Sequence, residues 1–575
     1  MRAALRIKLR LLALLLVVFA LLLVARLYFV QVVNGEEFAL RAERQYTKAA
    51  EAVYNRGSIY FMRKDGTHLS AAGIVTGFRF AITPDKIEDP EAAYTHVSTY
   101  LPLEREVFDA AYAKKGDPYE VIARFVPEEI GVQIAQNDIP GLIVERERWR
   151  VYPAQMTAAQ TVGFIAYDND DSLSGRYGLE KYYNDVLSRS QEGLFGNFFT
   201  ELFANIDDAV SDPRSARAGD LITSIEPQVG QMLREVLLSV ARTYNSREVG
   251  GIIMDPKTGD IIALDTVPSY DPNDVKNGDP ETFDNPLVEA RHEFGSIVKA
   301  LTVASGLDAG VITPDTTYTD TGCITLNTKK ICNHDLKSRG TATMQQVLGE
   351  SLNLGASYIA GRLGHDRMRA YIENLGLGTE TGIDLPGEIP GDIENIKNSP
   401  RDVEYATASF GQGIASTPVE MIRALSALAN EGKLPNPHIV KAIRLQSGVV
   451  RELSWGIQDR VYDPEAVEET TRMLVHVVDN DLKGGTAGIA EMSIAAKTGT
   501  AQIADPGGGY AEGRYFHSFF GYFPAYEPRF IILLYTREPQ GVRYASETLT
   551  DPFMELTRFL ISYYDIPPDR AEDTP

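Results

Sequence analysis

Cysteine and positive charge are both scarce in this sequence. Two cysteines among 575 residues are too few for a scaffold held together by disulfides. With a formal net charge of -23, the chain would repel a polyanion, which excludes nucleic acid as the main partner. No internal repeat with a convincing period is present, so a repeat architecture is not indicated. The apolar fraction of 44% is that of folded protein, and the length allows roughly two to four domains.

One long hydrophobic run lies near the N-terminus. Four basic residues within the first ten precede an apolar run over 11–25, which continues over 27–33 after Arg26. A membrane span needs about 20 apolar residues, and a single arginine near its end can reach the interface. We therefore predict a cytoplasmic tail over 1–10 and an uncleaved anchor over 11–33, with the rest of the chain outside the membrane. The alternative is a signal peptide cleaved after Ala20 or Ala25.

The first part of the remaining chain, residues 34–220, is predicted to form a separate domain that ends in a polar connector. Helical spacing occurs over 107–114 and 122–135, and strand-like pieces return over 141–151. The pattern changes after about residue 220. An amphipathic helix over 225–244 and a hairpin over 250–264 are predicted there.

Further elements are predicted along residues 221–565. A long helix over 464–478 has Pro464 in its first turn and Asp463 as a candidate cap. Strand-like runs follow over 493–503, 516–523, 530–535 and, more weakly, near Arg543, before a helix over 551–563. The acidic tail over 566–575 is predicted to be disordered.

A candidate nucleophile lies at the start of a predicted helix, in the segment Gly295-Ser296-Ile297-Val298-Lys299. Residues three apart share a helix face, so the Ser296 hydroxyl and the Lys299 amine are expected to be neighbours. Serine also lies at the positive end of the helix dipole, which favours an alkoxide. This spacing arises by chance about once in a chain this long. By itself it more often marks a helix start with a solvated lysine than a nucleophile.

Two further short motifs follow in order. Ser351-Leu352-Asn353 lies in a turn between predicted short helices, and Lys497-Thr498-Gly499-Thr500 lies on a predicted strand. Each motif is weak alone, but the three in this order are a strong signal for one kind of active site.

In these motifs the sequence resembles the serine transpeptidases of the penicillin-binding protein family. The anchor, Arg56–Ile59 and Gly178–Glu180 are similar to the pedestal of the class B, monofunctional branch. Ala300 and Phe294 stand where many members have proline, but neither change removes a reacting group. Other similar segments lie over 250–272, 381–388, 410–414, 484–487 and 517–522.

The resemblance implies an α+β fold: a penicillin-binding transpeptidase domain over 221–565, with an antiparallel sheet flanked by helices and a helical subdomain. An N-terminal pedestal over 34–220 and a single transmembrane helix complete the expected architecture. The implied location is the bacterial cytoplasmic membrane, with the catalytic domain extracytoplasmic. The class B enzymes contain no glycosyltransferase segment, so a glycan-polymerising membrane partner of the SEDS type and division proteins are implied, without a cofactor or metal.

The implied activity is that of a peptidoglycan D,D-transpeptidase, which takes stem peptides ending in D-Ala-D-Ala as donors and binds β-lactams covalently. Carboxypeptidase activity is a related possibility. Asn353 resembles the division-type enzymes, where elongation enzymes often have aspartate, so we favour a septal role. The alternatives are an elongation-type enzyme, a β-lactamase or β-lactam sensor, and a non-catalytic scaffold.

The expected roles follow from the chemistry of the side chains. Ser296 attacks a peptide carbonyl, and Lys299 accepts its proton only if burial and the nearby Lys497 lower the lysine pKa. Ser351 is suited to pass a proton to the leaving amine, and Asn353 to hold Lys299 and the substrate amide.

The third motif is expected to bind the substrate. Thr498 and Thr500 alternate along a strand, so both hydroxyls face the same side and can bind a carboxylate. Gly499 leaves room for the substrate backbone. By resemblance, the backbone N–H groups of Ser296 and Thr500 are the expected oxyanion donors. His517 is expected to be structural, because Lys299 already fills the role of the base.

Two other patterns allow more than one interpretation. Cys323 and Cys332 face each other if residues 324–331 form a hairpin turning at Asn327-Thr328, and an extracytoplasmic compartment would permit a disulfide. Unpaired cysteines, or a metal site with His334 and Asp335, are the alternatives. The glycine-rich stretch 505–509 suggests a phosphate loop, but no Gly-Lys-Ser/Thr helix start follows, so a flexible hairpin is favoured.

Overall fold

The computed structural model describes residues 56–137, 139–167, 173–188, 218–505 and 507–570. Among these, contacts divide the chain into two compact units. The smaller unit contains residues 74–149, and the larger contains 57–73, 150–166 and the chain from 174 onward. The anchor predicted over 11–33 lies outside the described residues. Within the described ranges, no helix is both long and apolar enough for a membrane span.

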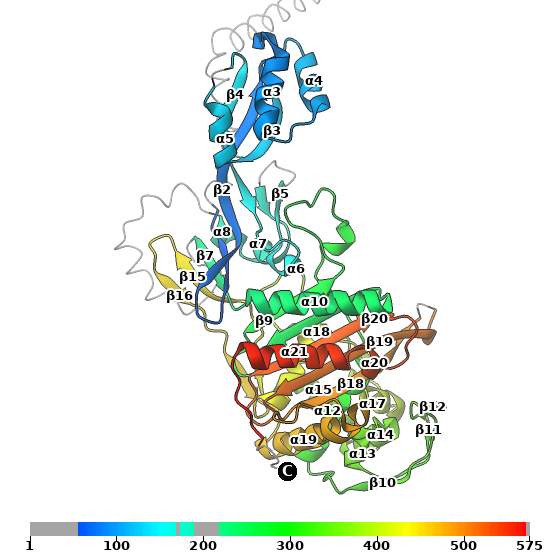
Figure 1. The fold of residues 1–575 in the computed structure, drawn as a ribbon. Helices are drawn as coiled ribbons and strands as arrows, with labels where there is room; N and C mark the ends of the chain where they lie inside the picture. Colours follow the sequence, from blue (N-terminus) through cyan, green and yellow to red (C-terminus); the bar gives the residue numbers. More distant parts are fainter. Residues whose placement is uncertain (1–55, 138, 168–172, 189–217, 506, 571–575) are drawn as a thin grey trace, which may run out of the picture. The chain divides into compact units, whose positions relative to one another are not determined.

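The larger unit is built around a five-stranded antiparallel sheet with the order β18-β19-β20-β8-β9. Two helices, α10 and α21, pack together over one face of this sheet (Figure 1). The bounds are β8 Glu248–Met254, β9 Ile261–Val267, β18 Ala495–Ala504, β19 Tyr510–Phe523, β20 Phe530–Arg537, α10 Pro227–Tyr244 and α21 Thr550–Tyr563.

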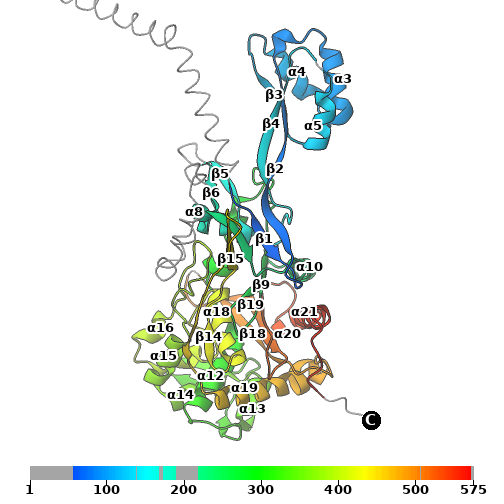
Figure 2. The same cartoon turned by 90° about the vertical axis from the view of Figure 1, so that its left-hand side faces the viewer.

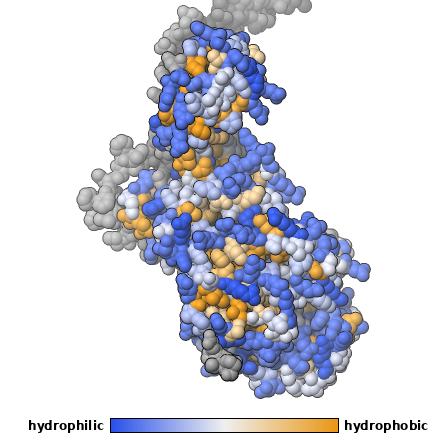
Figure 3. Space-filling model, viewed as in Figure 1, coloured by the Kyte–Doolittle hydropathy of each residue, from blue (hydrophilic) through white to orange (hydrophobic). Residues whose placement is uncertain are grey.

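The α10 helix forms where the apolar periodicity predicts it. Its apolar side chains are buried together with those of β8, β20 and α21 in one cluster. The Glu226 carboxylate caps the helix by accepting from the Val229 N–H at 2.7 Å, and Pro227 occupies its first turn. Asn245 ends it in the left-handed conformation. On the face shown in Figure 3 the surface is mostly hydrophilic with smaller hydrophobic patches, as expected for helices whose apolar sides face the sheet.

A helical region with small two-stranded sheets forms another part of the larger unit. These sheets pair β10 with β13, β11 with β12 and β14 with β17. The bounds of the helices are α11 Pro286–Glu289, α12 Val298–Asp308, α13 Met344–Gly349, α14 Asn353–Leu363, α15 His365–Asn374, α16 Glu394–Lys397, α17 Asp402–Ala408, α18 Pro418–Ser426, α19 Pro464–His476 and α20 Ala545–Thr548. The bounds of the strands are β10 Thr317–Asp320, β11 Cys323–Leu326, β12 Lys329–Cys332, β13 Gly340–Thr343, β14 Lys433–Pro435 and β17 Ile457–Arg460.

A second group of strands in the larger unit joins distant parts of the sequence. β7 pairs in parallel with β1 and antiparallel with β15, which in turn pairs with β16. Residues 68–72 of β2 pair with β1. The bounds are β1 Ile59–Met62, β2 His68–Ile82, β7 Gly219–Thr223, β15 Val440–Leu445 and β16 Val450–Glu452. Short elements over 159–187 complete this part. They are α6 Ala159–Val162, β5 Ile165–Tyr167, β6 Leu173–Gly175, α7 Gly178–Tyr182 and α8 Asn184–Leu187.

The smaller unit places helices against strands around its own apolar core. Residues 77–82 of β2 pair with β3, and β4 also pairs with β2. Figure 2 shows α3, α4 and α5 beside these strands. The bounds are α3 Pro90–Tyr100, α4 Arg105–Ala113, β3 Glu120–Pro127, α5 Glu128–Ala135 and β4 Leu142–Val151. The helix predicted over 122–135 is therefore wrong in its first half, where the chain is strand β3.

Three local predictions differ from the structure. Asp463 precedes α19 but its side chain makes no capping hydrogen bond; its own N–H donates to Asp308 Oδ1 at 2.6 Å. The chain near Arg543 is not a strand and leads into the short helix α20. The tail predicted to be disordered from residue 566 is held at Asp569, which accepts from the Ser493 N–H at 2.7 Å, and at Arg570, which pairs with Asp479 at 2.8 Å.

Candidate active site

The Ser296 hydroxyl and the Lys299 amine meet at the start of α12. Ser296 lies in a short 3-10 turn, Gly295–Ile297, that leads directly into the helix. Lys299 Nζ donates to Ser296 Oγ at 2.9 Å. Gly295 has φ +63°, and a side chain there would lie 2.8 Å from the Thr500 carbonyl oxygen. This position therefore requires glycine, which brings the nucleophile turn against β18.

The Lys299 amine is buried among neutral oxygens. Its side chain has no exposed surface, and it donates to the Ser351 carbonyl at 2.6 Å and to Ser351 Oγ at 3.1 Å. Burial, assisted by the charge of Lys497, lowers the pKa of Lys299 well below its ordinary value. A neutral amine beside a serine hydroxyl is the arrangement a general base requires.

Ser351 connects the two lysines. Its Oγ also accepts from Lys497 Nζ at 3.2 Å, so the hydroxyl lies between two amines. Lys497 further donates to the Thr498 carbonyl at 3.0 Å. Burial lowers the pKa of Lys497 to about 8, while Asp481 acts in the opposite direction. Ser351 has φ +55°, a left-handed conformation that is uncommon for a residue other than glycine.

Asn353 makes a different contact from the predicted one. It lies at the first position of α14, and its Nδ2 donates to the Cys332 carbonyl at 2.9 Å. The hydrogen bonds of Lys299 go instead to Ser296 and Ser351. Asn353 therefore joins the active-site turn to β12, and it still lines the cleft.

The third motif lies on β18, with Thr498 and Thr500 both partly exposed and the residues between and beside them buried. Both threonines line the cleft, while Thr500 Oγ1 also accepts from the Ala545 N–H at 3.0 Å. A side chain at Gly499 would lie 2.3 Å from Ser518 Oγ and 2.5 Å from the Phe294 carbonyl oxygen. In this structure Gly499 thus allows β18 to pack against the segment before Ser296, rather than making room for substrate as predicted.

These groups line a cleft of about 810 Å³. Several lining residues were not predicted from the sequence, because they come from separate segments that carry no short motif. They are Lys330, Arg339, Asp481, Lys483, Tyr510, Tyr515, Arg543 and Tyr544. His334, considered above only as a metal ligand, and Gln412, from the family-like segment 410–414, also line the cleft. His517, predicted to be structural, has no exposed surface and contacts Thr548 Oγ1 and the Arg543 carbonyl oxygen, both at 3.0 Å.

The two cysteines are bonded to each other in the structure. They occupy opposite positions of the β11–β12 hairpin, with a distance of 4.1 Å between their Cα atoms. Both sulfurs are thereby occupied, so neither is available as a thiolate ligand. Across the described residues, no group of three or more histidine, cysteine or acidic side chains is arranged to hold a metal ion.

Fold and site together are consistent with a serine-type acyltransferase. The family described as "Penicillin binding protein transpeptidase domain" matches residues 249–556, which is more than half of the chain. The family described as "Penicillin-binding Protein dimerisation domain" matches residues 53–194. The protein belongs to the penicillin-binding protein transpeptidase family. The predicted family and its α+β transpeptidase fold are thereby confirmed.

Known relatives cover nearly the whole chain. Stage V sporulation protein D of Bacillus subtilis is 26% identical over 94% of this chain and 82% of its own length. The "Peptidoglycan D,D-transpeptidase FtsI homolog" of Mesostigma viride is 26% identical over 95% of this chain and 94% of its own length. The crystal structure of penicillin-binding protein 2X from Streptococcus thermophilus superposes with a TM-score of 0.72 at 20% identity, covering 89% of this chain and 80% of that one.

Proposed function

We propose that the protein is a peptidoglycan D,D-transpeptidase of the class B type. The observation that carries this proposal is the distance of 2.9 Å between Lys299 Nζ and Ser296 Oγ, in a setting that lowers the pKa of the lysine well below its ordinary value. An amine that is neutral at physiological pH can accept the hydroxyl proton as the serine attacks.

The reaction follows from this geometry in two halves. Ser296 Oγ attacks the carbonyl between the last two residues of a stem peptide, and its proton passes to Lys299 Nζ. Ser351 Oγ, within hydrogen-bond distance of both lysines, delivers a proton to the leaving amine of D-alanine. An amine of a second stem peptide then attacks the ester, loses a proton to the same groups and releases Ser296. A peptide cross-link is formed.

The third motif and two backbone groups are assigned to binding. Thr498 and Thr500 hold the terminal carboxylate of the donor, and Lys497 supplies the positive charge that favours it. The backbone N–H groups of Ser296 and Thr500 stabilise the developing oxyanion. Each such donor lowers the barrier by roughly 3 kcal/mol. Because Thr500 Oγ1 accepts from the Ala545 N–H, its hydroxyl hydrogen is free to point toward the carboxylate.

The direct test is product analysis with the full chain in detergent. A pentapeptide donor ending in D-Ala-D-Ala and an amine acceptor should yield free D-alanine and a cross-linked peptide, and the Ser296→Ala variant should yield neither. Release of D-alanine without the cross-link would indicate a carboxypeptidase. Absence of both products with the unaltered protein would favour a binding scaffold.

We further propose a location and a cellular role. A membrane anchor over 11–33, a pedestal over 34–220 and an extracytoplasmic transpeptidase domain over 221–565 fit the matches to the dimerisation and transpeptidase domains and the basic residues before the apolar run. The similarity to the FtsI homolog of Mesostigma viride supports a septal role. The resemblance to the class B enzymes suggests a SEDS-type glycan polymerase and division proteins as partners. Depletion of the protein should give filamentous cells, whereas rounded cells would indicate a role in elongation.

A β-lactam-hydrolysing relative remains the second enzymatic possibility, because it would share the Ser296–Lys299 pair. It is disfavoured by the match over residues 53–194 to a dimerisation domain of penicillin-binding proteins. The rate at which an acylated Ser296 is released separates the two: a transpeptidase keeps the penicilloyl group, and a hydrolase releases it rapidly.

A further inference from the structure

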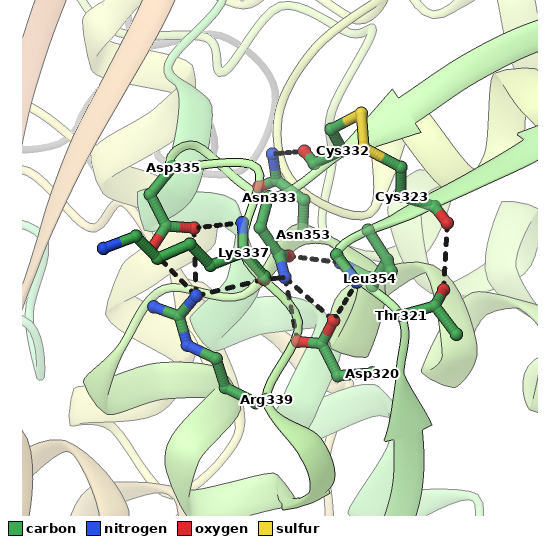
Figure 4. The surroundings of a disulfide bond; sticks show 11 residues. Asp320, Thr321, Cys323, Cys332, Asn333, Asp335, Lys337, Arg339, Asn353 and Leu354 are labelled. Carbon is green, nitrogen blue, oxygen red and sulfur yellow. Dashed lines mark hydrogen bonds and ion pairs between the residues drawn. A yellow bond between two sulfur atoms is a disulfide. The ribbon is translucent and has the colours of Figure 1, made fainter.

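The segment 320–340, which contains the disulfide hairpin, contacts residues before and after Ser351. Figure 4 shows the contacts to Asn353 and Leu354, which follow Ser351. After the motif, Asn353 Nδ2 donates to the Cys332 carbonyl at 2.9 Å, and the Leu354 N–H donates to Asn333 Oδ1 at 3.2 Å. Before the motif, Arg339 Nε donates to Glu350 Oε2 at 2.8 Å. Three side chains thus join this segment to the residues directly beside Ser351.

Asn333 is the centre of this network and is itself held on a buried carboxylate. Its Nδ2 lies 2.8 and 3.0 Å from the two oxygens of Asp320, which also accepts from the Gly322 N–H at 2.7 Å. Asn333 and Asp320 are each only 1% exposed. The side chain of Asn333 can therefore adopt only one orientation, with its amide toward Asp320 and its carbonyl oxygen toward the Leu354 N–H.

The turn that these contacts hold is strained. Ser351 has φ +55°, and a left-handed conformation costs a residue other than glycine energy that neighbouring contacts must offset. Lys299 holds the turn from within the site, through the Ser351 carbonyl at 2.6 Å. The contacts to Glu350, Asn353 and Leu354 hold it from outside.

We propose that Asn333, supported by Asp320 and assisted by Arg339, is a positioning residue for acylation of Ser296. This inference rests on the proposed function. Asn333 fixes the first turn of α14, and with it the place of Ser351 Oγ between the two lysines. It touches neither the nucleophile nor the base. Its loss is expected to slow acylation by moving Ser351 and Asn353 rather than by removing a reacting group.

The test depends on which member of the buried Asn333–Asp320 pair donates the hydrogen bond and which accepts it. Asn333→Asp keeps the acceptor for the Leu354 N–H but places a second carboxylate against Asp320, and like charges at this distance repel strongly. The rate at which a fluorescent penicillin acylates the full chain, measured by rapid mixing, should fall at least about tenfold. Adding Asp320→Asn restores a donor and an acceptor with the roles exchanged, and should bring the rate back to within about threefold.

Two further variants complete the experiment. Thr325→Ala, at an exposed position of the same hairpin, should leave the rate within about twofold. If Asn333→Asp fails to fold in a thermal melt, Arg339→Gln tests the other side of the turn and should slow acylation about fivefold. The acylation rates are compared at the same distance below each variant's melting temperature. Under that condition, a merely structural role of Asn333 would not predict that the double variant recovers the rate.

The outcomes separate this inference from the proposed function. No acylation of the unaltered protein would refute the proposed function itself. Normal acylation of the unaltered protein with an unchanged rate in Asn333→Asp, or in Arg339→Gln, would overturn the positioning role alone. A doubly exchanged variant that folds but stays as slow as the single variant would overturn it as well.

Discussion

At the scale of single residues, the environment of the two lysines gives the site its chemistry. Lys299 has no exposed surface, and Lys497 is only 3% exposed. Burial disfavours the charged form of both amines, and the charge of Lys497 lowers the pKa of Lys299 further. From one residue type the structure therefore provides a base whose pKa is well below its ordinary value and a binding group whose pKa is about 8.

The pH dependence of acylation should report these two groups. The rate should rise with pH as Lys299 loses its proton, at a pH well below the ordinary lysine value. It should fall again as Lys497, with its pKa of about 8, loses the charge that attracts the substrate carboxylate. A bell-shaped profile is therefore expected for the rate of acylation by a penicillin.

Replacing Lys497 with arginine separates the two limbs of that profile. Arginine stays charged throughout the accessible pH range, so Lys497→Arg should lose the alkaline limb near pH 8 and keep the acid limb. The absolute rate should fall, because the guanidinium does not fit the place of the amine. An unchanged alkaline limb in this variant would assign that limb to another group.

Most individual site residues could be predicted, but not all of their contacts. Ser296, Lys299, Ser351 and Lys497 belong to short motifs whose spacing is visible in the sequence, and the structure brings all four together. The partner of Asn353 could not be predicted, because the Cys332 carbonyl reaches it only through tertiary packing of a hairpin.

At the scale of elements, the β11–β12 hairpin connects the disulfide to the active site. Cys332 supplies both a sulfur to the bond and a carbonyl to Asn353. Opening the disulfide removes the covalent link between β11 and β12, although their backbone pairing remains, and should loosen the hydrogen bond that holds Asn353.

Reduction should therefore slow acylation by a few-fold and lower the stability by up to about 3 kcal/mol, the entropy of a short closed loop. The measurement is the acylation rate and the melting temperature with and without dithiothreitol. The matched control is Cys323→Ser with Cys332→Ser, which should be slow from the start and insensitive to the reductant. A reductant effect of equal size in this variant would contradict the link.

Packing of α10 on the central sheet is a second feature at this scale. Leu233 is fully buried and lies over Gly251 of β8, where a side chain would meet it at 2.9 Å. Leu233→Ala should cost about 2–5 kcal/mol of unfolding free energy. Glu235→Ala, at an exposed position of the same helix, should change it by less than about 1 kcal/mol. Chemical denaturation of both variants checks this, and equal losses would contradict the assignment of the two faces.

Elements whose apolar residues follow one period could be predicted from the sequence. Segments that combine a strand with a helix could not. The amphipathic pattern over 225–244 and the hairpin over 250–264 correspond closely to α10 and to β8 with β9. The stretch 122–135 combines strand β3 with helix α5, and short apolar runs of this kind satisfy either period. The chain near Arg543 precedes a helix of four residues, which is too short to leave a periodic pattern.

At the scale of the whole molecule, the chain is acidic overall, whereas its first 33 residues are basic and apolar. The net charge of -23 fits a protein whose partners are neither nucleic acid nor other polyanions. The division into an anchor, a pedestal and a transpeptidase domain remains a prediction.

Membrane attachment can be tested by extraction. The full chain should stay with the membranes after a wash at alkaline pH, because about 20 apolar residues anchor a protein almost irreversibly. A variant that begins at Asn34 should be released by the same wash. Release of the full chain would contradict the anchor, and a shortened mature N-terminus near Ala20 or Ala25 would identify a cleaved signal peptide.

The central claim is that Ser296 is a nucleophile that keeps its acyl group until an amine takes it. Intact mass spectrometry of the full chain in detergent after incubation with benzylpenicillin, beside Ser296→Ala, tests it most directly. A persistent adduct with the mass of one penicillin on the unaltered protein alone is the predicted result. An adduct on both proteins would place the nucleophile elsewhere, and no adduct on either would contradict the claim.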